Sequence, residues 1–206
     1  MGIVAPRVFV AFLLGAIPFA WLLVRLAKGV DVRTVGSGNA GATNASRAFT
    51  GKGARIGAFL LIYLLDAGKG WLAVWLAQMD TQGSLVVGVL AAAAAVLGHV
   101  FSPFLWFRGG KGVATATGAL LALDWQVTLI ALGVFAVVRF ATGHVFFGSL
   151  ALGAALPIAA IALHPDTAFG ERLSLTILCL AIAVFLCWTH RSNLQKHFAR
   201  RAPGAA

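Results

Sequence analysis

Residues 85–100 read LVVGVLAAAAAVLGHV, an apolar run whose single ionisable side chain, His99, stands next to its end. Runs of the same kind lie on both sides of it, at residues 8–26, 56–79, 113–140, 146–163 and 173–189. A helix that crosses a bilayer needs roughly 20 mostly apolar residues. The 206-residue chain is 60% hydrophobic and 11% charged, against about 25% charged in soluble domains. The sequence therefore predicts an all-α integral membrane protein that forms one domain over residues 1–206.

The charged side chains predict how the chain is oriented. Lys and Arg gather in alternate connections, and one set holds Arg25, Lys28, Arg33, Arg47, Lys52, Arg55, Arg108, Lys111, Arg139, Arg191, Lys196, Arg200 and Arg201. The opposite ends hold only Arg7 and Arg172. By the positive-inside rule the rich set faces the cytoplasm, which requires the run 113–140 to be two spans that turn near Asp124. We therefore expect seven transmembrane helices, with the amino terminus outside and the carboxyl terminus cytoplasmic.

Residues 36–41 read GSGNAG and satisfy the G-x-G-x-x-G spacing of a dinucleotide-binding turn. That turn follows a strand and precedes an acidic residue about 20 positions on, whereas positions 58–61 are apolar and lie in a predicted span. The stretch 109–112, GGKG, departs from a nucleotide phosphate loop, because Gly112 follows Lys111 where Ser or Thr is needed. The net charge of +10 is spread over loops rather than over a soluble face. Nucleotide and nucleic-acid binding are therefore not expected.

Both glycine-rich stretches nevertheless suit phosphate. Glycines let backbone amides point into one concavity, while Arg binds phosphate as a fork and Lys as a point charge. The candidate phosphate or substrate contacts are Ser37, Gly38, Asn39, Gly41, Thr43, Asn44, Arg47, Arg108, Gly109, Gly110, Lys111, Gly112 and Arg139. The alternative is structural, because glycines also allow close helix packing and interfacial cations mark topology. Two such stretches on one side, each with polar side chains and a cation, favour the phosphate site.

Polar side chains inside or beside the predicted spans are also candidates. Asp66 and Lys69 lie at i and i+3 on one helix face, where they can form an ion pair that supports the site. His99 flanks the second glycine-rich stretch. His190 and Asn193 share a helix face beside the last predicted span. No cluster of Asp, Glu, His or Cys has metal-ligand spacing, so no metal is expected.

These stretches, in this order, resemble the acyl-phosphate-dependent glycerol-3-phosphate acyltransferases of bacteria, the PlsY family. The matching stretches are GSGNAGATNASR (36–47), DAGKG (66–70), GHVFSPFLWFRGGKGVAT (98–115) and HRSNLQK (190–196). The resemblance implies a seven-span enzyme of the bacterial cytoplasmic (inner) membrane, without a cofactor and with its active site on the cytoplasmic side. It also implies transfer of a fatty acyl group from acyl phosphate to the sn-1 hydroxyl of glycerol 3-phosphate. The products would be lysophosphatidic acid, which opens phospholipid synthesis, and phosphate.

Carried over by motif, the catalytic candidates are Ser37, Arg47, Lys111, His190 and Asn193. We expect Arg47 and Lys111 to hold phosphate and to offset charge in the transition state, while loop amides and Asn193 position the reacting groups. The attacking hydroxyl could lose its proton to His190 or to a substrate phosphate oxygen. The second pKa of a phosphate, about 6, suits that task, and we favour the substrate phosphate.

The chain departs from the family pattern at two places and leaves two alternatives open. After Arg139 the family has a small polar pair, whereas this chain has Phe146 and Phe147, and the tail beyond Lys196 lacks a short acidic segment. One alternative is a transporter or binding protein for a phosphorylated solute, and another is a catalytically silent scaffold. Transporters usually place their site at the midplane between internal repeats, whereas these polar groups gather toward one membrane face without a repeat. The pattern favours the enzyme.

Overall fold

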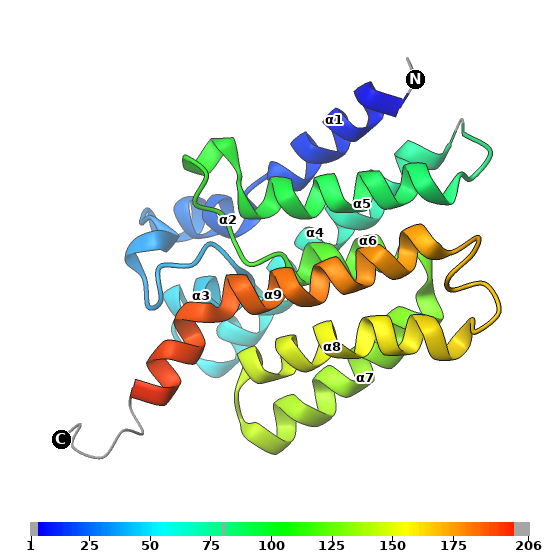
Figure 1. Ribbon diagram of the computed structural model, residues 1–206. Helices are drawn as coiled ribbons and strands as arrows, with labels where there is room; N and C mark the ends of the chain where they lie inside the picture. Colours follow the sequence, from blue (N-terminus) through cyan, green and yellow to red (C-terminus); the bar gives the residue numbers. More distant parts are fainter. Residues whose placement is uncertain (1–3, 80, 200–206) are drawn as a thin grey trace. The chain divides into compact units, whose positions relative to one another are not determined.

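Figure 1 shows the computed structural model of the chain, which describes residues 4–79 and 81–199. Every regular element in these ranges is helical, which confirms the all-α class. In chain order the elements are α1 (Val4–Ala16), α2 (Phe19–Lys28), η1 (Val32–Thr34), α3 (Ala42–Ala45), η2 (Ser46–Ala48), α4 (Lys52–Gln78), α5 (Leu85–Val100), η3 (Pro103–Leu105), α6 (Val113–Leu123), α7 (Trp125–Thr142), α8 (Val145–Leu163) and α9 (Leu173–Ala199). The chain divides into two compact units, Met1–Trp125 and Gln126–Ala206, and the expected single domain stays a prediction.

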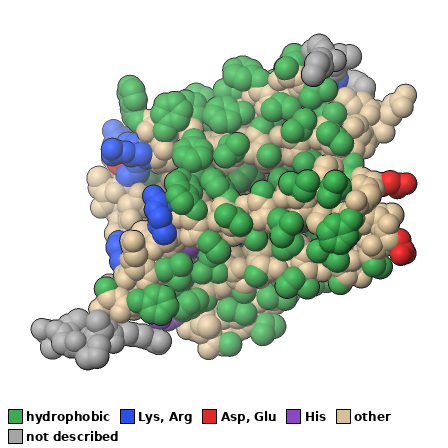
Figure 2. All heavy atoms as spheres, viewed as in Figure 1, with side chains coloured by type: hydrophobic (Ala, Val, Ile, Leu, Met, Phe, Trp, Pro, Cys, Tyr) green, Lys and Arg blue, Asp and Glu red, His purple; other side chains and the backbone are tan. Residues whose placement is uncertain are grey.

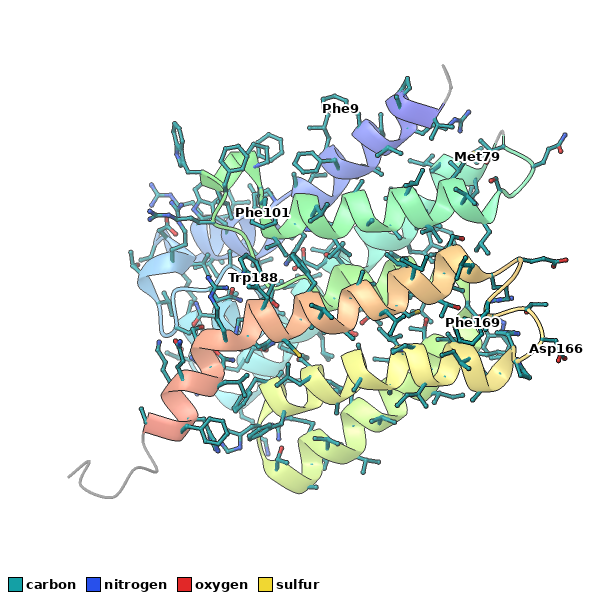
Figure 3. The ribbon with its side chains drawn as sticks, viewed as in Figure 1. Phe9, Met79, Phe101, Asp166, Phe169 and Trp188 are labelled. Atoms are coloured by element: carbon teal, nitrogen blue, oxygen red, sulfur yellow. The ribbon has the colours of Figure 1, made fainter. Side chains whose placement is uncertain are left out.

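The first unit is built on α4 and α5, with α1 and α6 packed against them. Figure 3 labels Met79 at the end of α4 and Phe101 just after α5, at opposite ends of this unit, so the two helices are antiparallel. Glycines allow the helices to touch. A β-carbon added at Gly98 would collide with the backbone of α1, and one at Gly118 would collide with the backbone of α4. Small residues at helix contacts are the usual means of close packing in membranes.

The first predicted span consists of two helices rather than one. It breaks at Ile17 and Pro18, because Pro lacks the N–H that a continuing helix needs. Two side chains bind the carbonyl oxygens freed at the end of α1. Ser102 Oγ donates to Ala16 O over 2.6 Å. Lys69 Nζ donates to Ile17 O over 2.7 Å, so the break belongs to the polar interior of the unit.

The run 113–140 forms two helices, as the charge pattern requires. α6 ends at Leu123 and α7 begins at Trp125, with Asp124 in extended backbone between them. α6 has 11 residues and is therefore about 16 Å long, roughly half the thickness of the hydrocarbon core. Residues 115–120 are buried within the protein, so the neighbouring helices shield this short helix.

Six helical stretches of the described ranges are long and apolar enough to cross a membrane. They are Val4–Lys28, Lys52–Gln78, Leu85–Leu105, Trp125–Thr142, Val145–Leu163 and Leu173–Ala199. Large apolar side chains stay exposed along them, including Leu64 of α4 and Leu90 of α5. Figure 2 shows hydrophobic side chains over much of the visible surface. Because such a surface fits lipid rather than water, the protein is a multi-pass integral membrane protein.

The second unit contains most of α7 together with α8 and α9, and α8 packs along α9. α9 continues to Ala199, well beyond the end of the last apolar run at residue 189. His190 and Asn193 are therefore helical, as their expected position on one helix face requires. Arg139 likewise lies in the last turn of α7. The end of the predicted tail, from Arg200 onward, lies outside the described residues.

Phe146 and Phe147 have a packing role in this unit. Their ring centroids are 4.1 Å apart, and the Phe147 ring is 5.0 Å from the ring of His197. His144 completes the cluster, with its ring 5.3 Å from that of His197. The four rings tie the start of α8 to the end of α9, so the aromatic pair that departs from the family pattern supports a helix contact.

Candidate functional site

One buried side chain, Asn44, holds the GSGNAG loop. Asn44 is 3% exposed and donates from its amide to Val32 O over 3.0 Å and to Val35 O over 2.8 Å. Its Oδ1 accepts the Ser37 N–H over 2.7 Å. Because these bonds use both hydrogens of the amide, Asn44 shapes the loop, and its expected contact with phosphate stays a prediction.

Arg47 lies against the bare face of the same loop. Gly36 and Gly38 have φ angles of 52° and 75°, a region that favours glycine. A β-carbon at Gly36 would lie 2.6 Å from Asn44 Oδ1 and 3.0 Å from Arg47 Cδ, so the glycine makes room for both. Ser37 and Arg47 are exposed. The loop therefore presents a hydroxyl and a guanidinium to the surroundings.

Gly109 and Gly110 hold the second loop close to the end of α5. The Gly109 N–H donates to Val100 O over 3.0 Å, and the Gly110 N–H donates to His99 O over 3.1 Å. A β-carbon at either glycine would collide with His99. Gly109 and Gly110 therefore allow close packing against the end of α5, and their expected contact with phosphate stays a prediction.

The other candidates of the two loops differ in exposure. Arg108 is exposed, and Gly38, Asn39, Gly41, Thr43 and Lys111 are partly exposed. Gly112 is buried and has a φ of 87° immediately before α6. Both loops thus offer a cationic side chain that a phosphate could reach.

The two glycine-rich loops meet at the same end of the first unit. Arg33 Nη1 donates to Leu105 O over 3.3 Å, which joins the segment before the first loop to the segment before the second. Beneath this contact Val32, Ala45 and Leu105 belong to one buried hydrophobic cluster. The loop charges predicted only that the two loops lie on the same side of the membrane. These contacts show that the two loops also lie close to each other.

Asp31 fixes the orientation of Arg33. Its carboxylate accepts bonds from Arg33 Nη2 over 2.6 Å, from Nε over 3.0 Å and from the backbone N–H over 2.8 Å. The side-chain bond to Arg33 is the main reason that the pKa of Asp31 falls to about 2, and the carboxylate raises the pKa of Arg33. Because the folded pKa of Asp31 lies below the unfolded one, the pair stabilises the protein above about pH 4. That contribution is lost as the pH falls toward about 2.

Replacing Asp31 with Asn is expected to remove this contribution. The pair is partly exposed, so we expect a loss below about 1 kcal/mol at neutral pH. Thermal unfolding of the purified protein would show a Tm difference from wild type that narrows as the pH falls from about 4 to about 2. Asp166→Asn, at an exposed carboxylate of the second unit, controls for the loss of a charge. A Tm difference that stays constant over this range would contradict the assignment.

A buried polar column of Lys69, Asp66 and His99 stands behind the second loop. Lys69 Nζ lies 2.7 Å from Asp66 Oδ1, which confirms the predicted ion pair, and His99 Nδ1 lies 3.6 Å from the same oxygen. None of the three residues is more than 7% exposed. The His99 ring lies against Gly110, and Lys69 also binds Ile17 O. The column therefore connects the break in the first span to the loop that carries Lys111.

His190, Asn193 and Arg139 belong to the second unit. His190 is 3% exposed, and its Nδ1 lies 2.9 Å from Leu186 O. A neutral ring that donates from Nδ1 carries its lone pair on Nε2, as a general base requires. Asn193 lies one turn further along α9 and is partly exposed. A site shared by these residues and the loops of the first unit stays a prediction.

Three side chains that shape the site were missed in the sequence. Asp31 precedes a short 3₁₀ turn and accepts a backbone N–H there, and an acidic residue at such a position is a recognisable capping signal. Arg33 and Ser102 act over long sequence separations, on Leu105 O and Ala16 O. No local sequence pattern predicts contacts of this kind.

Known proteins resemble this chain along nearly its whole length. The family model described as glycerol-3-phosphate acyltransferase matches residues 6–200. A glycerol-3-phosphate acyltransferase of Myxococcus xanthus is 45% identical over 199 residues, 94% of this chain and 95% of that protein. One from Jannaschia is 43% identical over 188 residues, 90% of this chain and 85% of that protein. One from Prochlorococcus marinus is 36% identical over 192 residues, 92% of this chain and 91% of that protein.

The fold is similar to crystal structures of PlsY, described as an integral membrane glycerol 3-phosphate acyltransferase. The glycerol 3-phosphate form is 31% identical with a TM-score of 0.82, over 96% of this chain and 93% of that chain. The lysophosphatidic acid form is 30% identical with a TM-score of 0.79, over the same shares of the two chains. The similarity therefore extends from sequence to fold.

Proposed function

The chain belongs to the glycerol-3-phosphate acyltransferase family of integral membrane proteins, and we propose that it uses acyl phosphate as the donor. The fatty acyl group passes to the sn-1 hydroxyl of glycerol 3-phosphate. The products are lysophosphatidic acid and inorganic phosphate. The observation that carries this proposal is the family match over residues 6–200, which includes both glycine-rich loops and the buried ion pair. The glycerol 3-phosphate and lysophosphatidic acid forms of PlsY support the choice of acceptor and product.

The reaction needs positioning and charge more than it needs a nucleophilic side chain. The hydroxyl oxygen of glycerol 3-phosphate attacks the carbonyl carbon of the acyl phosphate. The bond between that carbon and the phosphate oxygen breaks, and its electron pair leaves with phosphate. Because the acyl group arrives activated, no covalent enzyme intermediate is required. Both substrates carry phosphate, so the site must hold two anionic groups close together.

The exposed groups of the two loops supply that charge. Arg47 binds one phosphate as a fork, and Lys111 binds phosphate as a point charge and offsets negative charge in the transition state. The Ser37 hydroxyl and the Asn193 amide orient the reacting groups by hydrogen bonds. The contacts of Asn44 support a shaping role for that residue rather than a direct one.

The buried column supports the second loop from behind. Asp66 pairs with Lys69 and lies beside His99, and the His99 ring fills the space next to Gly110. A shift of one of these side chains would displace the backbone of the second loop, which carries Lys111. The column is therefore a set of positioning residues, which act on the reaction through Lys111.

Replacing His190 with Gln distinguishes the two proton acceptors. We favour the substrate phosphate, and on that mechanism the variant keeps a measurable kcat whose pH profile still reports a group of pKa about 6. A loss of about 10²–10⁴-fold in kcat, with glycerol 3-phosphate binding unchanged, would assign the proton to His190 instead. His197→Gln, on the same helix, is the matched control. Steady-state kinetics and calorimetric binding of glycerol 3-phosphate provide the two measurements.

We propose seven crossings of the bacterial cytoplasmic membrane, with α6 as the shielded short one. The positive-inside pattern supports an external amino terminus and a cytoplasmic carboxyl terminus. A carboxyl-terminal fluorescent protein should then fluoresce in cells, and an amino-terminal epitope should bind antibody on intact spheroplasts. Both termini on one side would mean that α6 does not cross. The glycine-rich loops would lie on the cytoplasmic side, where glycerol 3-phosphate is available.

The choice of donor is tested with purified protein. Palmitoyl phosphate and labelled glycerol 3-phosphate should give labelled lysophosphatidic acid, with the acyl group at the sn-1 position by NMR. Palmitoyl coenzyme A in place of the acyl phosphate should give no product. Product from the coenzyme A ester alone would overturn the donor assignment. No product from either donor, together with uptake of labelled glycerol 3-phosphate into vesicles, would support a transporter.

A further inference from the structure

Three aromatic side chains stand out from the loop that follows α5. Phe104 is 60% exposed, Trp106 is 82% exposed and Phe107 is 63% exposed, whereas Leu105 between them is buried. We call Phe104, Trp106 and Phe107 the aromatic tip. Figure 3 labels Phe101, which lies just after α5 and opens this loop. The tip gains little from packing within the protein, so its exposure needs another explanation.

The backbone directs the tip outward by a fixed turn. Trp106 and Phe107 have φ angles of 54° and 59°, a region that bulky residues seldom adopt. The turn is nevertheless well bonded, since the Trp106 N–H donates to Pro103 O over 3.2 Å and the Phe107 N–H donates to Ser102 O over 2.8 Å. Ser102 is tied in turn to Ala16 O at the end of α1. Hydrogen bonds within the first unit therefore fix the outward direction of the aromatic tip.

The position of the tip along the span indicates what covers it. The apolar stretch of α5 and η3 runs from Leu85 to Leu105 and ends within the tip. Leu90 and Leu97 are exposed on α5, so the lipid-facing surface of that helix continues toward the tip. Aromatic side chains, Trp above all, are enriched where a span meets the headgroups. The exposed Arg108 follows directly and suits the phosphates of anionic headgroups.

We propose that the aromatic tip inserts into the lipid of the membrane interface at the end of α5. Arg108 contacts the headgroups, and the buried Leu105 holds the tip to the protein. Because Gly109, Gly110 and Lys111 follow at once, insertion keeps the second glycine-rich loop at the depth of the headgroups. This placement would bring Lys111 to the level at which a lipid donor presents its phosphate. The insertion itself is independent of the acyl transfer proposed above.

The depth of the tip is measured with a nitroxide label in bilayer nanodiscs that contain anionic phospholipid. Cys179 and Cys187 are first replaced with Ala, and a single Cys is introduced at position 106, at Leu64 of α4 or at Thr34 of η1. Leu64 is an exposed side chain of a span, and Thr34 is exposed outside the spans. Electron paramagnetic resonance then compares collisions with oxygen, which prefers lipid, and with a water-soluble nickel chelate.

At position 106 we expect oxygen collisions to exceed those of the chelate, as at position 64, and the reverse at position 34. A second label at Phe104 should agree with the label at 106, which guards against a local disturbance by either one. Labels at 104 and 106 that behave like the label at 34 would overturn the proposal. The readout does not require turnover, so it can fail while the acyltransferase activity stands, or hold while that activity fails.

Discussion

Replacing Lys111 with Met is expected to lower kcat/KM for acyl transfer by about 10²–10³-fold. Met keeps most of the length of the side chain and removes the cation, so the loss of charge is the main change. That charge should count more in the transition state than in the bound substrates, because negative charge grows on the carbonyl oxygen and on the departing phosphate. We therefore expect the larger part of the loss in kcat and the smaller part in KM for glycerol 3-phosphate.

Lys52→Met is the matched control for this prediction. Lys52 is an exposed lysine at the start of α4, in the same unit, and no role in the site is assigned to it. Its replacement should leave both kinetic constants unchanged and should lower the net charge equally. Lys111→Arg tests geometry, because a planar guanidinium cannot reproduce a compact ammonium. Equal effects at positions 111 and 52 would show that Lys111 contributes only to the net charge of the protein and makes no specific contact with the reacting groups.

Replacing Asp66 with Asn is expected to be the most destabilising single change in the buried column. The substitution keeps the shape of the side chain and leaves Lys69 without its buried counter-charge, at an expected cost of about 3–5 kcal/mol. Removing both charges should cost less, because no uncompensated ion remains in the interior. The double variant Asp66→Asn with Lys69→Met should therefore unfold at a higher temperature than Asp66→Asn alone. Thermal unfolding in detergent gives the Tm of the wild type, of Asp66→Asn and of the double variant.

The comparison also separates stability from positioning. If the column sets the second loop, the double variant should recover much of its stability yet keep a raised KM for glycerol 3-phosphate. Asp166→Asn, at an exposed turn, should change neither quantity. Costs that simply add, so that the double variant is the least stable, would show that Asp66 and Lys69 do not act as a pair.

The spans could be predicted from the sequence because lipid selects for long apolar runs, and this signal is strong for α5 and α8. Loop charge correctly divided the run 113–140 near Asp124, although length alone would have allowed one tilted helix. The break at Pro18 was missed, since the flanking residues are apolar on both sides. The last apolar run ends at residue 189 because hydropathy falls at His190, whereas the helix itself continues to Ala199.

The site was predictable in its parts and not in their connections. The Asp66–Lys69 pair followed from helical spacing, because i and i+3 lie on one face. The role of Asn44 did not follow, since an amide in a glycine-rich loop can face either a ligand or the backbone. The bond from Arg33 to Leu105 O spans distant parts of the chain, so only the tertiary fold could reveal it.

A crystal structure of this protein with glycerol 3-phosphate would show where the substrate phosphate binds. We expect the phosphate to lie between the two loops of the first unit, in contact with the Arg47 guanidinium or the Lys111 ammonium. We also expect the sn-1 hydroxyl to point to a place where an acyl phosphate can enter from the lipid. A phosphate bound away from both loops, with Arg47 and Lys111 facing solvent, would contradict the proposed site.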